Sequence, residues 1–250
     1  SRRQRQMCIR DSARIQGMED EDHQTTWCIE KAMEFIKLSL NHDKEQPWCI
    51  SINPFAPHPP FDPPQSFKDR LRVEDMPLPL WKDGELDNKP QSQKDSYYMG
   101  SQSGMVRSSV GITDEEKREN TLEYYALVEH LDYQLGRLID YLEKSGQREN
   151  TIIMFMSDHG EMLGNHGKFD KHAYCYEDVI RTPLLFCKDL NNCENGTKCD
   201  TYCNTLDIAQ TFFDFAGTSC ENGTSLDKIC KKQISESEEQ EIYSNYYKSV

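Results

Sequence analysis

The chain has 250 residues, of which 36% are hydrophobic and 29% are charged, and its formal net charge at pH 7 is −14. This length can bury a sizeable core and favours one domain or most of one large domain, and the recurring apolar runs favour a globular protein over a disordered one. The acidic balance argues against a nucleic-acid-binding surface, which needs clustered Lys and Arg, and no apolar run approaches the length of a membrane span.

Residues 1–14 differ in composition from the rest of the chain. They carry five Arg and one Asp, and the remainder carries 24 basic and 42 acidic side chains. The opening letters SRRQRQMCIRDS resemble a translated sequencing-adapter scar, which predicts a non-native or disordered tail. The alternative is a basic tail that binds an acidic partner. We assign residues 21–250 to the fold.

The first predicted elements are a helix, a strand and a proline-rich loop. Apolar residues at helical spacing over 25–40 predict an amphipathic helix that packs on a sheet, and residues 48–52 are typical of a strand. Six prolines within 53–64 then exclude regular structure. His58 lies in this loop just past the predicted strand. A lone loop histidine is usually a surface residue.

Residues 66–112 predict an irregular surface excursion, in which Trp81, Tyr97 and Tyr98 either line a pocket or anchor the loop by packing. A capping box at Thr113 then opens a long amphipathic helix that ends near residue 146. A strand, a crossover helix and a second strand imply a parallel sheet covered by helices. We interpret His130 and Asp132 on this helix as structural.

The most informative segment is residues 151–186. Its apolar run 152–156 predicts a buried strand, and polar side chains begin where that run stops. Asp158 and His159 could both reach one divalent cation there, since ligands bind beyond the carboxyl ends of strands in open α/β sheets. Carboxylate oxygen suits Ca²⁺ or Mg²⁺, and an imidazole also admits Mn²⁺. Alternatively, Asp158 only satisfies backbone amides in a strand-to-loop turn.

Basic side chains follow within one loop, before the apolar run 183–187 returns the chain to the core. They could bind an anion beside the candidate metal ligands, although an isolated lysine is usually a solvated surface residue. The residues concerned are His166, Lys168, Lys171 and His172.

The last quarter of the chain combines cysteines with glycosylation sequons. Five of the ten cysteines lie there, together with the sequons at Asn195 and Asn222. Disulfides and glycans occur together in an oxidising compartment, so we predict the secretory pathway, with a lysosomal or extracellular destination. A zinc site is the alternative, but the CxxC pairs typical of structural zinc are missing. The cysteine-rich insertion spans 187–203, and a short helix is predicted over 207–216.

Several of these motifs, taken in order, resemble one known family. SDHGEMLGNHG, Lys171, YED, RTPLL and TLDIAQTFFDFAG resemble the later part of the catalytic domain of sulfatases in the alkaline phosphatase superfamily. The resemblance implies a three-layer αβα sandwich around a mostly parallel sheet. It also implies that Asp158 and His159 bind the metal, that Lys171 binds the sulfate oxygens, and that His58 contacts the ester and assists departure of the alkoxide. Lys168 and His172 are additional candidates for substrate binding.

One part of the family pattern is missing. Sulfatases use a formylglycine made by oxidation of a cysteine in a Cys-x-Pro-Ser-Arg motif, and no cysteine here is followed by that pattern. The paired aspartates of the family's metal site are also missing, so we expect a fragment that is incomplete at its N-terminus and inactive alone.

The expected function is therefore metal-dependent hydrolysis of a small-molecule or carbohydrate sulfate ester, with Ca²⁺ as the first choice of metal and Mn²⁺ or Mg²⁺ as alternatives. Two other functions stay open. One is a phosphodiesterase or phosphonate monoester hydrolase of the same superfamily. The other is a secreted sulfatase-like binding protein without catalytic activity.

Overall fold

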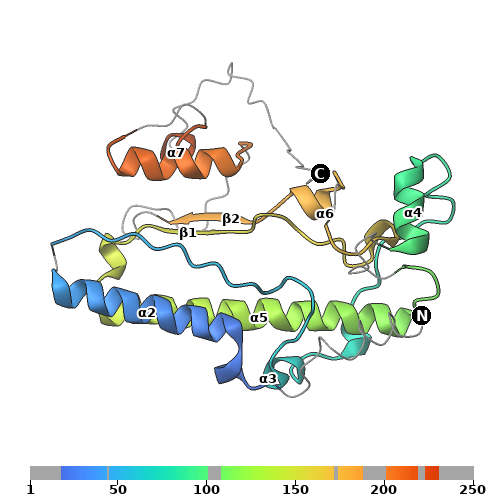
Figure 1. The fold of residues 1–250 in the computed structure, drawn as a ribbon, viewed down its shortest axis with the longest axis horizontal. Coiled ribbons are helices and arrows are strands. Elements are labelled where there is room, and N and C mark those ends of the chain that lie inside the picture. Colours follow the sequence, from blue (N-terminus) through green and yellow to red (C-terminus); the bar gives the residue numbers. More distant parts are fainter. Residues whose placement is uncertain are drawn as a thin grey trace. The chain divides into compact units, whose positions relative to one another are not determined.

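The computed structural model describes residues 18–43, 45–100, 108–171, 174–187, 201–218 and 223–230 (Figure 1). The chain divides into two compact units, Ser1–Arg148 with Glu161–Asp170, and Glu149–Gly160 with Lys171–Val250. Some predictions fall outside the described residues: the tail 1–14, His172, Asn195, Asn222 and most of the insertion 187–203.

The first unit is built on two long helices that pack against each other. These are α2, Gln24–His42, and α5, Asp114–Lys144, which run side by side in Figure 1. Ile29, Ala32 and Ile36 of α2 are buried, as are Ala126 and Leu127 of α5. The shorter elements of this unit are η1 (Asp20–Asp22), α3 (Gln65–Lys68), η2 (Val73–Asp75), α4 (Gln91–Met99) and η4 (Asn165–Gly167).

Local signals define the start and the end of α5. Glu116 N donates to Thr113 Oγ1 at 3.2 Å, and Thr113 N donates to Glu116 Oε2 at 2.9 Å, which completes the predicted capping box. After Lys144 the chain turns through Gly146 at a φ of 70°, a backbone conformation that glycine adopts without steric cost. The predicted helix over 113–146 is confirmed.

A buried polar cluster joins the start of the chain to α5. Asp20 Oδ1 lies 2.6 Å from His130 Nε2, and accepts from Gln134 Nε2 at 2.7 Å and from Thr26 Oγ1 at 2.7 Å. The His23 ring meets the His130 ring edge-on with centroids 4.6 Å apart. His130 is fully buried in this cluster, so its interpretation as a structural residue is confirmed, whereas Asp132 is exposed and the same interpretation does not hold for it.

The two histidines of the cluster are held neutral. Burial, helped by the neighbouring His130, lowers the pKa of His23 to about 4. Burial also lowers the pKa of His130, and this effect outweighs the opposing attraction of Asp20. In the unfolded chain both imidazoles take up protons near pH 6.5. The unfolded state therefore binds more protons than the folded state between that pH and about 4.

We expect the first unit to lose stability as the pH falls from 6.5 towards 4, by about 2–3 kcal/mol through His23 alone. The His23→Asn variant tests this. Asn can still accept the hydrogen bond from Thr25 N that His23 Nδ1 accepts at 3.1 Å as the N-cap of α2, but it does not titrate. Urea unfolding at pH 7 and pH 4.5 should show a smaller loss in this variant than in the wild type. An equal loss would contradict the prediction.

The second unit contains the two strands found in the described residues. β1, Ile153–Met156, pairs antiparallel with β2, Leu184–Cys187, so that Ile153 lies opposite Cys187 and Met156 opposite Leu184. Both predicted apolar runs are therefore strands. The parallel sheet is not confirmed, because the two described strands pair in opposite directions and the first strand of the predicted strand–helix–strand unit, at 48–52, carries no strand assignment.

The predicted strand at 48–52 is not formed in the described residues. That segment is extended but carries no strand assignment. A strand requires a hydrogen-bonded neighbour, and none of the described residues supplies one.

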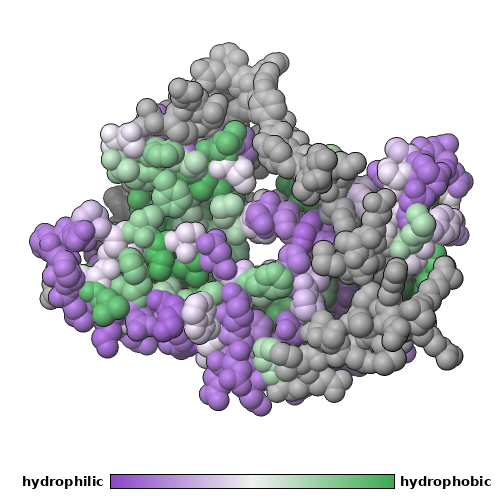
Figure 2. All heavy atoms as spheres, in the orientation of Figure 1, coloured by the Kyte–Doolittle hydropathy of each residue, from purple (hydrophilic) through white to green (hydrophobic). Residues whose placement is uncertain are grey.

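The second unit also holds α6, Glu177–Ile180, α7, Thr205–Phe215, and α8, Leu226–Cys230. Asn204 caps α7, and the buried Asp207 carboxylate accepts from the backbone amides of Asn204 and Thr224, both at 2.7 Å. The helix predicted over 207–216 is confirmed with a slightly earlier start. Figure 2 shows apolar surface over α7, and its exposed residues include Leu206, Phe212, Phe213 and Phe215.

None of the described helices combines the length and the apolar character that a membrane crossing requires. Of the cysteines predicted to form disulfides, only Cys203 has a described side chain, so that prediction stays open.

Candidate functional site

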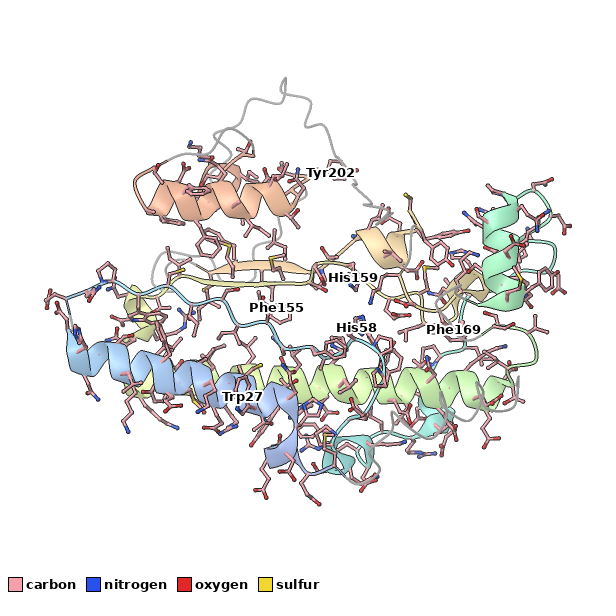
Figure 3. All side chains as sticks on the ribbon, in the orientation of Figure 1. Trp27, His58, Phe155, His159, Phe169 and Tyr202 are labelled. Carbon is pink, nitrogen blue, oxygen red and sulfur yellow. The ribbon has the colours of Figure 1, made fainter. Side chains whose placement is uncertain are left out.

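The turn that follows β1 is fixed by hydrogen bonds within the second unit. Ser157 N donates to Pro183 O at 3.4 Å, and Gly160 N donates to Val179 O at 2.8 Å. Ser157 Oγ donates to His159 O at 2.7 Å. These bonds tie both ends of the turn to the chain that leads through α6 into β2. The candidate metal ligands therefore lie on a defined backbone at the end of a strand (Figure 3).

Asp158 and His159 face each other across this turn. His159 Nδ1 lies 2.9 Å from Gly160 O, so this nitrogen carries the proton and donates it to the carbonyl. In the neutral ring His159 Nε2 then has a lone pair, and it lies 3.6 Å from Asp158 Oδ2. Asp158 Oδ1 accepts from His159 N at 3.0 Å, as in the turn interpretation. The second carboxylate oxygen is directed to the imidazole.

This pair fits a divalent cation. Histidines that bind metals usually donate the other ring N–H to a carbonyl or a carboxylate, which fixes the ring and leaves a lone pair for the ion. A carboxylate oxygen and an imidazole lone pair repel each other when no cation lies between them. The Asp158 side chain is 83% exposed and open to a ligand. No group of three or more such ligands forms among the described residues, so the pair supplies part of a coordination shell.

Gly160 is required by close backbone packing. A Cβ atom at this position would lie 1.9 Å from Asp178 O and 2.9 Å from the Asp178 carbonyl carbon. Any side chain would push the turn away from α6 and break the bond from Gly160 N to Val179 O. This close packing therefore explains why residue 160 is a glycine.

Lys171 belongs to the same unit as Asp158 and His159. Its side chain is half-buried and its Nζ atom is buried. A buried ammonium group is a stronger anion ligand than a solvated one, because water screens it less. Lys171 is thus not the solvated surface lysine of the alternative interpretation.

His58 belongs to the first unit, within the proline-rich loop. Its Nδ1 lies 2.6 Å from Pro59 O, and its ring packs against Phe55 with centroids 4.4 Å apart. Ala56 and Phe61 on either side are buried against Leu127 of α5, which anchors the loop. The bond to Pro59 O makes Nδ1 the donor and leaves Nε2 to accept or carry a second proton.

Lys168 is also in the first unit and is 1% exposed. Its Nζ donates to Gln93 O of α4 at 2.9 Å, and burial together with the nearby Lys89 lowers its pKa. The contact gives Lys168 a structural partner. Its role as a substrate ligand stays a prediction.

The loop 161–170 is held by the surface excursion of the first unit. Trp81 and Tyr97 stack with centroids 5.0 Å apart and an interplanar angle of 10°. A Cβ on Gly167 would lie 2.5 Å from the Tyr97 ring and 2.7 Å from the Trp81 ring. Trp81 and Tyr97 therefore fit the interpretation as packing anchors of the loop better than the interpretation as pocket-lining residues.

Three residues of this loop, among them the anion-binding candidate His166, have contacts that no sequence pattern predicted. Asn165 Oδ1 accepts from Leu80 N at 2.7 Å, and His166 N donates to Leu80 O at 2.8 Å. Glu161 Oε1 accepts from two backbone amides of its own loop. In the sequence, Gly164 and Gly167 could have indicated these contacts, because glycines mark places where a loop packs closely against other groups.

Comparisons with known proteins now decide the family. The family model described as Sulfatase matches residues 8–218. The chain belongs to the sulfatase family. An arylsulfatase of Clostridium perfringens is 31% identical over 206 residues, which are 81% of this chain and 40% of the relative. This sulfatase chain therefore spans about two fifths of the length of that relative.

Solved structures show the fold. A phosphonate monoester hydrolase from Silicibacter pomeroyi superposes with a TM-score of 0.74 at 23% identity, covering 89% of this chain and 44% of that one. A protein solved in complex with its substrate D-glucosamine-2-N,6-O-disulfate superposes with a TM-score of 0.61 at 23% identity, covering 82% and 51%. The sulfatase chain has the α/β fold of the alkaline phosphatase superfamily.

Proposed function

We propose that the whole protein is a metal-dependent sulfuric ester hydrolase and that this chain supplies half of its active site. The observation that carries the proposal is the Asp158–His159 pair of a sulfatase-family chain. Its imidazole is fixed by Gly160 O, and His159 Nε2 lies 3.6 Å from the Asp158 carboxylate. This geometry supports the proposal that both side chains bind one cation. The family match supports the reaction class.

Asp158 and His159 would hold the cation through Asp158 Oδ2 and His159 Nε2. Ca²⁺ is our first choice, because carboxylate and other oxygen ligands dominate its sites, with Mn²⁺ or Mg²⁺ as alternatives. When bound, the metal supplies Lewis-acid polarisation of the sulfate ester. We propose that the formylglycine nucleophile and the remaining metal ligands come from the part of the relatives' length that this chain does not span.

The other candidate residues act on the sulfate group. Lys171 offers a buried ammonium group to the sulfate oxygens, where a positive charge stabilises the charge that develops during transfer. His58 would orient the ester and protonate the departing alkoxide through Nε2, because its Nδ1 already bonds Pro59 O. We keep Lys168 and His172 as secondary candidates for substrate contact.

Fold and location complete the proposal. In the whole protein, β1 and β2 would belong to a larger, mostly parallel sheet in a three-layer αβα sandwich. The sequons at Asn195 and Asn222 and the cysteine-rich insertion support a lysosomal or extracellular location. The substrate class that we favour is a carbohydrate sulfate ester. A structural neighbour was solved with a sulfated glucosamine as its substrate.

The test is a comparison of matched esters on the full-length protein. An aryl sulfate, a 6-O-sulfated glucosamine, an aryl phosphodiester and an aryl phosphonate are assayed with and without added Ca²⁺. We expect kcat/KM to be higher for the sulfate esters. Higher kcat/KM for the phosphorus esters would assign the protein to the phosphodiesterase or phosphonate hydrolase branch. Binding of the sulfated sugar without any turnover would indicate a non-catalytic binding protein.

A further inference from the structure

The loop 161–170 contains an unusual concentration of left-handed backbone. Leu163, His166 and Asp170 have φ values of 46°, 56° and 67°, and no other described non-glycine residue has a positive φ. Residues with side chains rarely adopt this conformation and keep it only where surrounding contacts impose it. The contacts of these three residues therefore show which interactions maintain the conformation of the loop.

One carboxylate oxygen, from Glu161, accepts hydrogen bonds from the backbone amides of two of these three residues. Glu161 Oε1 accepts from Asp170 N at 2.5 Å and from Leu163 N at 3.3 Å. Met162 N donates to Asp170 O at 3.3 Å, so the first residues of the loop bond both backbone groups of its last residue. The loop is thus closed at its base, and a side-chain oxygen of Glu161 is the acceptor for one of the bonds that close it.

The closure acts one peptide bond away from Lys171. Asp170, whose amide Glu161 binds, is followed directly by Lys171, and the φ of Asp170 sets the direction in which the chain leaves the loop. Gly160 on the other side of Glu161 is fixed by its bond to Val179 O. Without the carboxylate, the base of the loop loses the bond to Asp170 N and keeps the bond from Met162 N to Asp170 O, so the backbone that leads into Lys171 is held less firmly.

We propose that Glu161 is a positioning residue that sets the place of the Lys171 ammonium group by closing the loop 161–170. The role rests on the proposed function, in which Lys171 binds the sulfate oxygens. Glu161 acts as a hydrogen-bond acceptor for backbone amides. It transfers no proton and does not contact the substrate.

Two variants of the full-length protein separate this role from others. Glu161→Gln keeps a side-chain oxygen that can accept from Asp170 N and Leu163 N, whereas Glu161→Ala removes it. Glu119→Ala removes an exposed glutamate of α5 and is the matched control. Two readouts need no substrate: amide hydrogen exchange at Asp170, and the rate at which acetic anhydride labels the buried Lys171 Nζ.

We expect Glu161→Ala to raise both rates about 10-fold or more, and Glu161→Gln and Glu119→Ala to stay within about 3-fold of the wild type. On a sulfate ester, Glu161→Ala should lower kcat/KM by about 10-fold to 100-fold, with Glu161→Gln close to the wild type. The loss should include a higher KM, because Lys171 binds the sulfate group.

Unchanged exchange and labelling in Glu161→Ala would overturn the proposal. Equal loss of activity in Glu161→Gln and Glu161→Ala would also overturn it, since the charge and not the acceptor would then matter. A wild-type protein that hydrolyses no sulfate ester would refute the proposed function, while the exchange and labelling rates would still decide whether Glu161 positions Lys171.

Discussion

Replacing Asp158 with alanine should lower kcat/KM of the full-length protein for a sulfate ester by about 1000-fold or more. The variant removes the carboxylate oxygen that lies 3.6 Å from His159 Nε2 and leaves a single ligand at the end of β1. Lewis-acid assistance contributes several kcal/mol to such reactions, and each 1.36 kcal/mol corresponds to a factor of ten in rate. The measurement is steady-state kinetics over a range of Ca²⁺ concentrations.

The fold should survive this change, because the Asp158 side chain is 83% exposed and, within the described part of the chain, bonds to His159 alone. Calorimetric titration with Ca²⁺ should show weaker binding in Asp158→Ala than in the wild type. Asp132→Asn is the control, since Asp132 is an exposed carboxylate on α5 and should leave both activity and Ca²⁺ binding unchanged. Normal Ca²⁺ affinity in Asp158→Ala would remove Asp158 from the metal site.

Replacing Gly160 with alanine should destabilise the protein by about 3 kcal/mol and abolish activity. The added Cβ would lie 1.9 Å from Asp178 O, a backbone atom that cannot rotate away. The turn must therefore move, and the bond from Gly160 N to Val179 O is lost with it. Because Asp158 and His159 precede this glycine directly, their relative orientation changes as well.

The matched control for this variant is Gly136→Ala in the middle of α5. A Cβ there meets nothing within 4 Å, and alanine favours a helix over glycine by about 0.5–1 kcal/mol. Urea unfolding should thus show opposite signs for the two glycine-to-alanine changes. A Gly160→Ala protein as stable and active as the wild type would show that α6 yields freely and that the turn is not fixed by packing.

The sequence allowed prediction of those parts of the fold that depend on local signals. The capping box at Thr113 and the apolar periodicity after it predicted α5, and the segment before Gly217 predicted α7. The apolar runs at 152–156 and 183–187 both became strands. Each of these elements is specified by residues within about one helical turn or strand of each other.

Long-range pairing was harder to predict. The direction in which β1 pairs with β2 depends on chain path and not on composition, and the segment 48–52 has strand-like residues without a described partner. In the candidate site, the place of Asp158 and His159 after a strand made them candidate metal ligands, and the resemblance to sulfatases favoured that role over a plain turn. The bond between Asn165 and Leu80 joins residues 85 positions apart, so no local pattern could indicate it.

The first unit takes its last segment, residues 161–170, from beyond β1, which belongs to the second unit. During synthesis this helical unit cannot finish folding when α5 has left the ribosome. It must wait until about two dozen further residues have emerged and the strand of its neighbour has already been made. The first unit can therefore be completed only after the first strand of the second unit has been synthesised. A chain that ends before residue 170 would contain α2 and α5 without the contacts that the loop 161–170 adds.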